Sequence, residues 1–524
     1  IVGLHPRPLA SSLYRSLVTA KVWSRARRSL GYREMPATDL VLLLAGRPFV
    51  DVRASFNSFL PDGVEEKDGT RLVDGWLDRL EKHPEFHDKV EFEIAQTVHD
   101  PCFEEDWCSR TPGLLDPQGF GRWKSALQAM TRRLLDTSPE GTLRRSLGVV
   151  ETLARKQELR GSALPGRPAA LLARASELLD EAREEGTLPF AVVARHAFVA
   201  ETFLRGAVRR GALGAEDVQR FRAGVRTVSS RFGEDCTRVR KGELEPSVFL
   251  ERYGHLRPGT YDILSPRYAD APEAILSGAV PDAAPGGRDD FHAGPGLDRL
   301  LVEMDMPLDG ASFLEYARLA IAGREYAKFV FTRSLSDALE CIARWGEASG
   351  TTREELSWLS VDEILDMLVE PPLAPVREVI LPLVEQARRM ERIGHGLKLG
   401  YLIRSPRDVY VMPRHRSAPN FVTRKIARGP VVHLDGRDFS VSDLNGAVVC
   451  IRNADPGFDW LFARGIAGLV TQFGGTNSHM AIRCTEYGIP AAIGCGEQLF
   501  ETIRTARACE LDAGANSVVP LEVS

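Results

Sequence analysis

Hydrophobic residues recur at helical spacing along most of the chain. Leu72, Trp76, Leu77 and Leu80 are typical, because residues three or four apart lie on one face of a helix. The same spacing predicts further helices over residues 13–24, 121–135, 143–159, 167–184, 189–209, 215–232, 310–347 and 376–403. Each helix would bury one stripe against its neighbours, so the pattern indicates a large, mostly helical layer.

Short alternating runs predict a few strands within this helical region. Residues 39–44 and 48–52 flank a Gly-Arg turn, and residues 407–412 form a third such run. We therefore expect a mixed α/β N-terminal part over residues 1–105 and a mostly helical domain over residues 106–415. Within the latter, residues 270–297 are rich in Pro, Gly, Ala and Asp, which predicts a mobile loop.

The pattern changes again near the C-terminus. Short β runs alternate with helical segments: the β runs cover residues 431–432, 447–451, 467–471, 491–494 and 509–511, and the helices 458–464, 478–487 and 497–505. Such alternation predicts a compact α/β domain. We place it at residues 431–524, after a hinge linker at residues 416–430. The expected fold class is multidomain α+β.

Composition limits the possible classes of partner. The net charge of −5 gives no reason to expect nucleic acid or an anionic membrane. Apolar runs such as Val41 to Ala45 are much shorter than the ~20 residues of a membrane span. The eight cysteines are scattered without a CxxC pair, so we expect no metal site and a reducing, cytoplasmic location.

One histidine lies where a glycine turn is expected to meet a helix. The run is Gly474-Gly475-Thr476-Asn477-Ser478-His479. Backbone N–H groups at a helix start favour negative charge, so a phosphoryl group on His479 would be held there. The candidate phosphate-stabilising residues are Gly474, Gly475, Thr476, Ser478 and Arg483. The alternative is an ordinary surface or core histidine.

This motif resembles the phosphohistidine motif of the swivelling domain in phosphoenolpyruvate (PEP)-utilising enzymes. That family includes phosphoenolpyruvate synthase, pyruvate phosphate dikinase and rifampicin phosphotransferase. The resemblance continues through Gly488-Ile489-Pro490-Ala491 and Gly494. It implies that residues 431–524 are a swivelling phosphohistidine domain. The order of the domains resembles the part of rifampicin phosphotransferase that follows its ATP-grasp domain.

A second segment, residues 249–268, carries groups suited to binding an acceptor. It contains His255, Arg257, Asp262 and Arg267 between glycines that free the backbone, and arginine donors suit phosphate or carboxylate. It resembles a segment of the substrate-binding domain in the same family, where His255 would act as a base and the arginines as a clamp. A structural loop with Asp262 paired to an arginine explains the residues equally well.

The resemblance implies an ATP-dependent, dikinase-type phosphotransferase. His479 would relay a phosphoryl group to a small-molecule acceptor. The sequence has no Walker loop and no GxGxxG after a strand. We therefore expect ATP and Mg²⁺ to bind mainly outside this chain, on an ATP-grasp domain upstream or on a partner. The alternatives are an ATP-dependent condensing enzyme with the same relay, or a non-catalytic regulatory relative without an ATP site.

Overall fold

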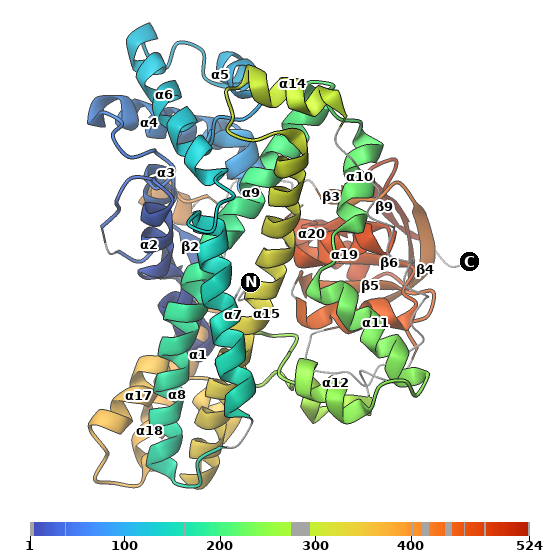
Figure 1. Ribbon diagram of the computed structural model, residues 1–524. Helices are drawn as coiled ribbons and strands as arrows, with labels where there is room; N and C mark the ends of the chain where they lie inside the picture. Colours follow the sequence, from blue (N-terminus) through green and yellow to red (C-terminus); the bar gives the residue numbers. More distant parts are fainter. Residues whose placement is uncertain are drawn as a thin grey trace.

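The structure is a computed structural model. It describes residues 5–36, 38–161, 164–273, 294–397, 399–400, 402–410, 419–434, 443–454, 456–475 and 478–521. The arrangement is multidomain α+β, as predicted: a large helical region lies beside a domain built on a mixed sheet (Figure 1).

Long amphipathic helices build the larger region. Their bounds are α1 Pro8–Tyr14, α2 Val22–Ser29, α3 Val52–Asn57, α4 Glu66–Lys82, α5 Phe103–Arg110, α6 Pro117–Leu134, α7 Thr142–Arg160, α8 Pro168–Glu181, α9 Leu188–Arg209, α10 Ala215–Gly224, α11 Val228–Arg240, α12 Pro246–Tyr253, α14 Pro295–Glu303, α15 Gly310–Ala348, α16 Arg353–Leu356, α17 Val361–Val369 and α18 Val376–His395. A hairpin of β1 (Val41–Leu44) and β2 (Arg47–Val50) accompanies them, as predicted.

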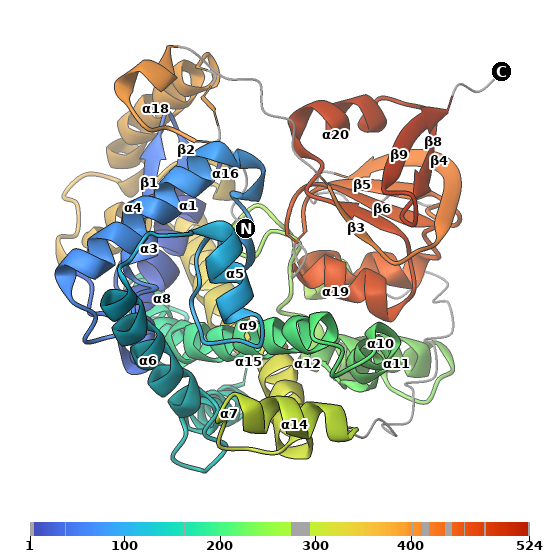
Figure 2. The same ribbon diagram turned by 90° about the horizontal axis from the view of Figure 1, so that it is seen from above.

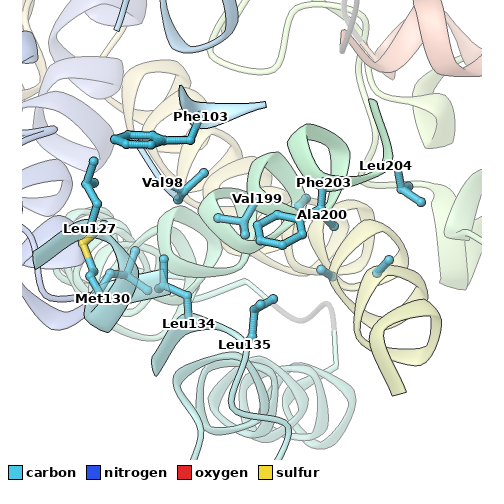
Figure 3. Packing of buried hydrophobic residues seen from close by; sticks show 14 of the residues in the cluster. Val98, Phe103, Leu127, Met130, Leu134, Leu135, Val199, Ala200, Phe203 and Leu204 are labelled. Carbon is cyan, nitrogen blue, oxygen red and sulfur yellow. The ribbon is translucent and has the colours of Figure 1, made fainter. Parts of the chain in front are cut away.

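Helices α9 and α15 form the centre of this region. Figure 3 shows α9 residues Val199, Ala200 and Phe203 in the same buried cluster as Phe103 and Met130. The stretch Pro168–Arg209 is apolar and long enough to cross a membrane, but 61% of its most apolar window is buried inside the fold. A core helix has this composition because it is covered by protein on most sides.

The C-terminal domain contains a seven-stranded sheet with the order β3-β7-β6-β5-β4-β8-β9. Strands β4 to β7 are parallel neighbours, whereas β3, β8 and β9 join antiparallel. The strands are β3 Asn420–Val422, β4 Ile426–Leu434, β5 Val448–Asn453, β6 Gly468–Phe473, β7 Ala491–Ile493, β8 Ala508–Asp512 and β9 Ser517–Leu521.

Successive side chains on a strand point to opposite sides of the sheet, and here both sides are apolar. On β5, Val448 and Cys450 pack with helix α20 (Gly496–Arg504), whereas Val449 and Ile451 belong to the opposite cluster. That second cluster includes α19 (His479–Glu486), the 3₁₀ helix η7 (Pro456–Arg464) and residues of α11 and α12. The two domains therefore share one hydrophobic core, and α19 lies next to α11 (Figure 2).

Several segments differ from the sequence expectations, and among them is the helix predicted over residues 13–24, which is interrupted before α2 begins at Val22. The helix predicted over residues 215–232 is broken, because Thr227 caps a new helix, α11. The strand predicted at residues 407–412 is wrong in its described part, since Asp408 accepts the backbone N–H of Arg404 and Ser405 and folds Pro406–Val409 into a 3₁₀ turn. From Asn420 onward, the linker predicted at residues 416–430 belongs to the sheet.

Most of the expected mobile loop at residues 270–297 lies outside the described residues. At its described ends, the 3₁₀ helix η5 covers Tyr268–Asp270, and α14 begins at Pro295.

Backbone groups of the two domains touch at Gly457. A Cβ on this glycine would lie 2.1 Å from the carbonyl oxygen of Arg257 and 2.2 Å from Cα of Pro258. The hydroxyl of Tyr268 donates to the carbonyl of Gly457 across the same contact (2.9 Å). Since backbone cannot move aside as a side chain does, only glycine allows this approach.

We expect Gly457→Ala to loosen the contact between the domains without unfolding either. Hydrogen–deuterium exchange at amides of α11 and α19 should become at least about tenfold faster, which corresponds to about 1.4 kcal/mol of lost protection. Gly121→Ala is the control, because its Cβ would meet nothing within 4 Å. Unchanged exchange in Gly457→Ala would show that the contact does not hold the domains together.

Candidate active site

His479 follows a glycine turn after strand β6. Gly474 has φ +133°, a backbone conformation that side chains rarely adopt, and it leads into α19. The Oγ of Ser478 accepts the backbone N–H of Ala481 (3.4 Å), which caps the helix. His479 is therefore the first residue of α19. Thr476 lies outside the described residues.

Carboxylates from both domains hold the imidazole of His479. Its Nδ1 lies 2.5 Å from Oε2 of Glu325 on α15, and its Nε2 lies 2.6 Å from Oδ1 of Asp459 on η7. Ser229 of α11 donates to the other oxygen of Asp459 (3.0 Å). His479, Glu325 and Asp459 are all buried, so three ionisable groups and a hydroxyl form one network between the domains.

Mutual charge sets the protonation of this network. Burial alone would lower the pKa of His479, but Asp459 and Glu325 outweigh burial and raise it to about 9. Burial would raise the pKa of Glu325, yet His479 lowers it to about 2. The pKa of Asp459 is lowered for the same reason, despite its burial. At neutral pH the site therefore holds an imidazolium between two carboxylates.

A cavity opens from this network into the helical domain. It encloses about 590 Å³ of space between atoms, part of it open to solvent. Its polar lining includes His255, Arg257, Glu325, Lys328 and His479, and its apolar lining Val228, Phe232, Tyr253, Leu256 and Phe329. The fold thus brings two of the predicted acceptor-loop residues, His255 and Arg257, to the same cavity as His479.

His255 faces the cavity as a neutral imidazole. Its Nε2 donates to the carbonyl of Phe329 (3.3 Å). Burial lowers its pKa to about 3, and its Nδ1 is buried without a hydrogen-bond partner among the described residues. A neutral imidazole with such a nitrogen is suited to accept a hydrogen bond.

The arginines of this loop are already paired. Arg257 donates to Ser336 (3.0 Å), to Glu340 (3.2 Å) and to two carbonyls, one of which is that of Asp262 (3.4 Å). Arg267 pairs with Asp270 (2.9 Å) and does not line the cavity. The side chain of Asp262 accepts the backbone N–H of Leu264 (3.0 Å). These contacts are those of a structural loop, in which Arg257 reaches the backbone carbonyl of Asp262.

Arg483 also serves the packing between the domains. It donates to Glu486 (2.5 Å), to the carbonyl of Ser229 (2.9 Å) and to the hydroxyl of Tyr487 (2.9 Å). Its guanidinium stacks over the ring of Tyr487 at 4.5 Å. In this arrangement Arg483 tethers α19 to α11 and supports Asp459, whose Oδ1 lies 3.5 Å from its Nε.

The sequence analysis missed Glu325, Lys328, Asp459 and Ser229. One signal was present for Glu325: it belongs to the buried face of α15, among residues such as Ala320 and Ala327. A charged group on a buried helical stripe needs a partner and so marks a candidate site. Asp459 and Ser229 carry no comparable signal.

Comparison with known proteins agrees with this geometry. Residues 444–515, which include His479 and Asp459, match the family model of the PEP-utilising enzyme, mobile domain. The match confirms the resemblance to PEP-utilising enzymes indicated by the histidine motif.

Two curated relatives extend the similarity beyond that domain. The chain is 26% identical over 289 residues to a rifampicin phosphotransferase of Streptomyces sviceus, covering 49% of this chain and 32% of that protein. It is 26% identical over 296 residues to a rifampicin phosphotransferase of a Streptomyces species, covering 47% and 31%. The matched part thus spans about a third of the length of these relatives.

We expect the stability of the protein to fall as the pH rises through 9. The pKa of His479 is raised from 6.5 to about 9, so its contribution is complete below pH 6.5 and is lost as the pH approaches and passes 9. The upper limit is about 3 kcal/mol. Urea unfolding of the wild type and His479→Gln measures this, and their difference should shrink between pH 6.5 and 9.5. A difference that does not change with pH would contradict the imidazolium assignment.

Proposed function

We propose that this chain is the transfer part of a phosphotransferase in which His479 carries a phosphoryl group to a small-molecule hydroxyl. The observation that supports this most directly is the position of His479 at the wall of a cavity between the two domains. The named activity of the relatives, rifampicin phosphotransferase, points to the same reaction class.

The transfer step follows from the groups at the cavity. The N–P bond of phosphohistidine breaks while a P–O bond forms to the acceptor oxygen. The phosphoryl group is on Nε2, where it takes the place of the contact with Asp459. Glu325 takes the hydroxyl proton and passes it to Nδ1, which lies 2.5 Å away, so the imidazole leaves as a neutral ring. After transfer the free ring takes up a second proton at neutral pH, because its pKa is about 9. Lys328, which lines the same cavity, offsets charge on the moving phosphoryl group.

The acceptor is a neutral hydroxyl on a mainly apolar molecule. Aromatic and aliphatic side chains form much of the wall, and an apolar wall favours an apolar ligand. An anionic acceptor would need a free cation clamp, but Arg257 donates to Glu340 and Ser336. The cavity therefore favours a hydroxyl over an enolate or a carboxylate as the acceptor.

Phosphorylation of His479 by ATP, which we call charging, takes place in a different arrangement of the domains. In the docked arrangement His479 is 8% exposed and lies between the two domains, so a nucleotide on another domain does not reach its ring. The C-terminal domain therefore moves away from α15 to receive a phosphoryl group. We place ATP and Mg²⁺ on an ATP-grasp domain in the same protein or on a partner.

The described residues do not fit a Mg²⁺ site of their own. They contain no group of three or more His, Cys, Asp or Glu placed to hold a metal ion. Glu325 and Asp459 are paired with His479. No step of the transfer at this cavity is assigned to the metal.

We expect His479→Asn to abolish an acid-labile phosphate on the protein while leaving the fold intact. The test combines this protein with its ATP-grasp domain, ATP and Mg²⁺, and follows intact mass and nucleotide products. Ser478 and Gly475 remain unchanged in the variant, so the helix start is preserved. A labile phosphate that persists in His479→Asn would contradict the proposal.

We expect Lys328→Met and Glu325→Gln to slow transfer from phosphorylated His479 by about 10²-fold or more, because they remove charge stabilisation and the base. Rifampicin is the first acceptor to test. Arg267→Met is the matched control, because Arg267 does not line the cavity, and it should retain transfer. Equal rates in all three variants would place the acceptor elsewhere.

A further inference from the structure

A second surface of the helical region is apolar and exposed. It combines the hairpin β1–β2 with the C-terminal end of α18. Its residues are between 45% and 61% exposed: Leu42, Leu43, Val50, Met390, Ile393 and Leu397. We call this surface the hairpin face. Single exposed apolar residues are normal, but a group of this size on adjoining elements indicates a binding surface.

Backbone contacts make the hairpin and the end of α18 one continuous surface. A Cβ on Gly394 would lie 2.5 Å from the carbonyl oxygen of Ala45 in the hairpin turn. Arg47 donates from its guanidinium to the carbonyls of Leu397 (3.1 Å) and Leu399 (3.4 Å). In Figure 2 the hairpin lies directly beside α18.

Within the part of the chain that the structure describes, the hairpin is left uncovered on both of its faces. Leu42 and Leu43 are neighbours on one strand, so their side chains point to opposite sides, yet each is 48% exposed. A two-stranded sheet with exposed leucines on both sides is marginal in water. Sheet edges of this kind also attract further chains. A partner that covers the hairpin would stabilise it and would protect its exposed edge.

Two observations identify the partner. The matched segments cover about a third of each curated relative, and the proposed relay requires a nucleotide-binding domain. In addition, His5, the first described residue, stacks on His395 at the end of α18, with ring centres 4.2 Å apart. His5 therefore lies beside the hairpin face.

The segment that connects the helical region to the C-terminal domain also begins beside the hairpin face. Helix α18 ends at His395, and the chain runs from there to β3 in the sheet domain. A domain docked on the hairpin face would be next to the root of the segment that carries His479. It would thus be well placed to receive the C-terminal domain for charging.

We propose that the hairpin face is the docking surface for the ATP-binding domain that charges His479. This inference rests on the proposed function. It adds a defined surface, distant in sequence from the histidine motif, on which charging depends while transfer at the cavity does not.

The test uses the protein that carries residues 1–524 together with its ATP-binding domain; if that domain is a separate chain, the two are mixed. The variants are Leu43→Glu and Ile393→Glu. Each should lower the rate of ATP-dependent phosphorylation of His479 at least tenfold. Leu159→Glu is the matched control, because Leu159 is 90% exposed on α7, and it should be charged like the wild type.

Folding is checked by circular dichroism and thermal midpoint. If Leu43→Glu lowers the midpoint, Leu43→Thr replaces it, since threonine favours strands and removes most of the apolar contact. The same tenfold or greater loss in Ile393→Glu and Leu43→Thr supports the proposal.

Other outcomes would overturn the proposal that the ATP-binding domain docks on the hairpin face. Normal charging in both hairpin-face variants shows that the ATP-binding domain docks elsewhere. A dimer in sedimentation that these variants dissociate assigns the face to a second copy of the chain. Binding to phosphatidylcholine–phosphatidylserine vesicles that the variants abolish assigns it to a lipid surface. A wild type that acquires no acid-labile phosphate on His479 refutes the proposed function itself, and the docking proposal with it.

Discussion

The imidazolium of His479 between Glu325 and Asp459 is the interaction on which the arrangement of the two domains depends. Each of these groups would be costly to bury alone. Together they compensate one another, and Ser229 satisfies the remaining oxygen of Asp459. Because Glu325 belongs to the helical region, and Asp459 and His479 to the sheet domain, the imidazolium has its second carboxylate only when the domains are in contact.

Apolar packing around this network gives the contact its strength. The cluster that contains Met480 and Trp460 also contains Phe232 and Tyr253 of the helical region. Burial of such side chains is worth about 25 cal/mol for each Å² of apolar surface. The ion network in turn sets which face of the sheet domain meets α15. Burial thus supplies most of the affinity, and charge pairing supplies orientation.

Much of the architecture could be predicted from the sequence, since it depends on local periodicity. The apolar run at residues 447–451 predicted a strand, and the spacing along residues 310–347 predicted a long helix. The break at Thr227 and the 3₁₀ turn at Asp408 were not predicted, because side-chain caps override the apolar pattern there. Strands β3 and β9 were missed because short edge strands carry little periodic signal.

The candidate site was predictable only in part. His479 stands out through its glycine turn, which is a local feature. That His255 shares its cavity, and that Glu325 and Asp459 hold its ring, depends on contacts between distant segments. The arginines of the loop at residues 249–268 show that suitable chemistry alone does not identify a ligand site. Their chemistry suited a ligand clamp, but Glu340 is a nearer partner that the sequence does not place.

The close approach of Gly457 to Arg257 and Pro258 has a consequence for how this protein could diverge. The backbone of the loop at residues 249–268 also forms the contact with Gly457 of the sheet domain. A change of loop conformation that admits a new ligand would also displace the phosphoryl carrier. A change of ligand is therefore expected at lining side chains outside this loop, such as Val228 and Thr332, where the cavity can change shape while the loop backbone stays fixed.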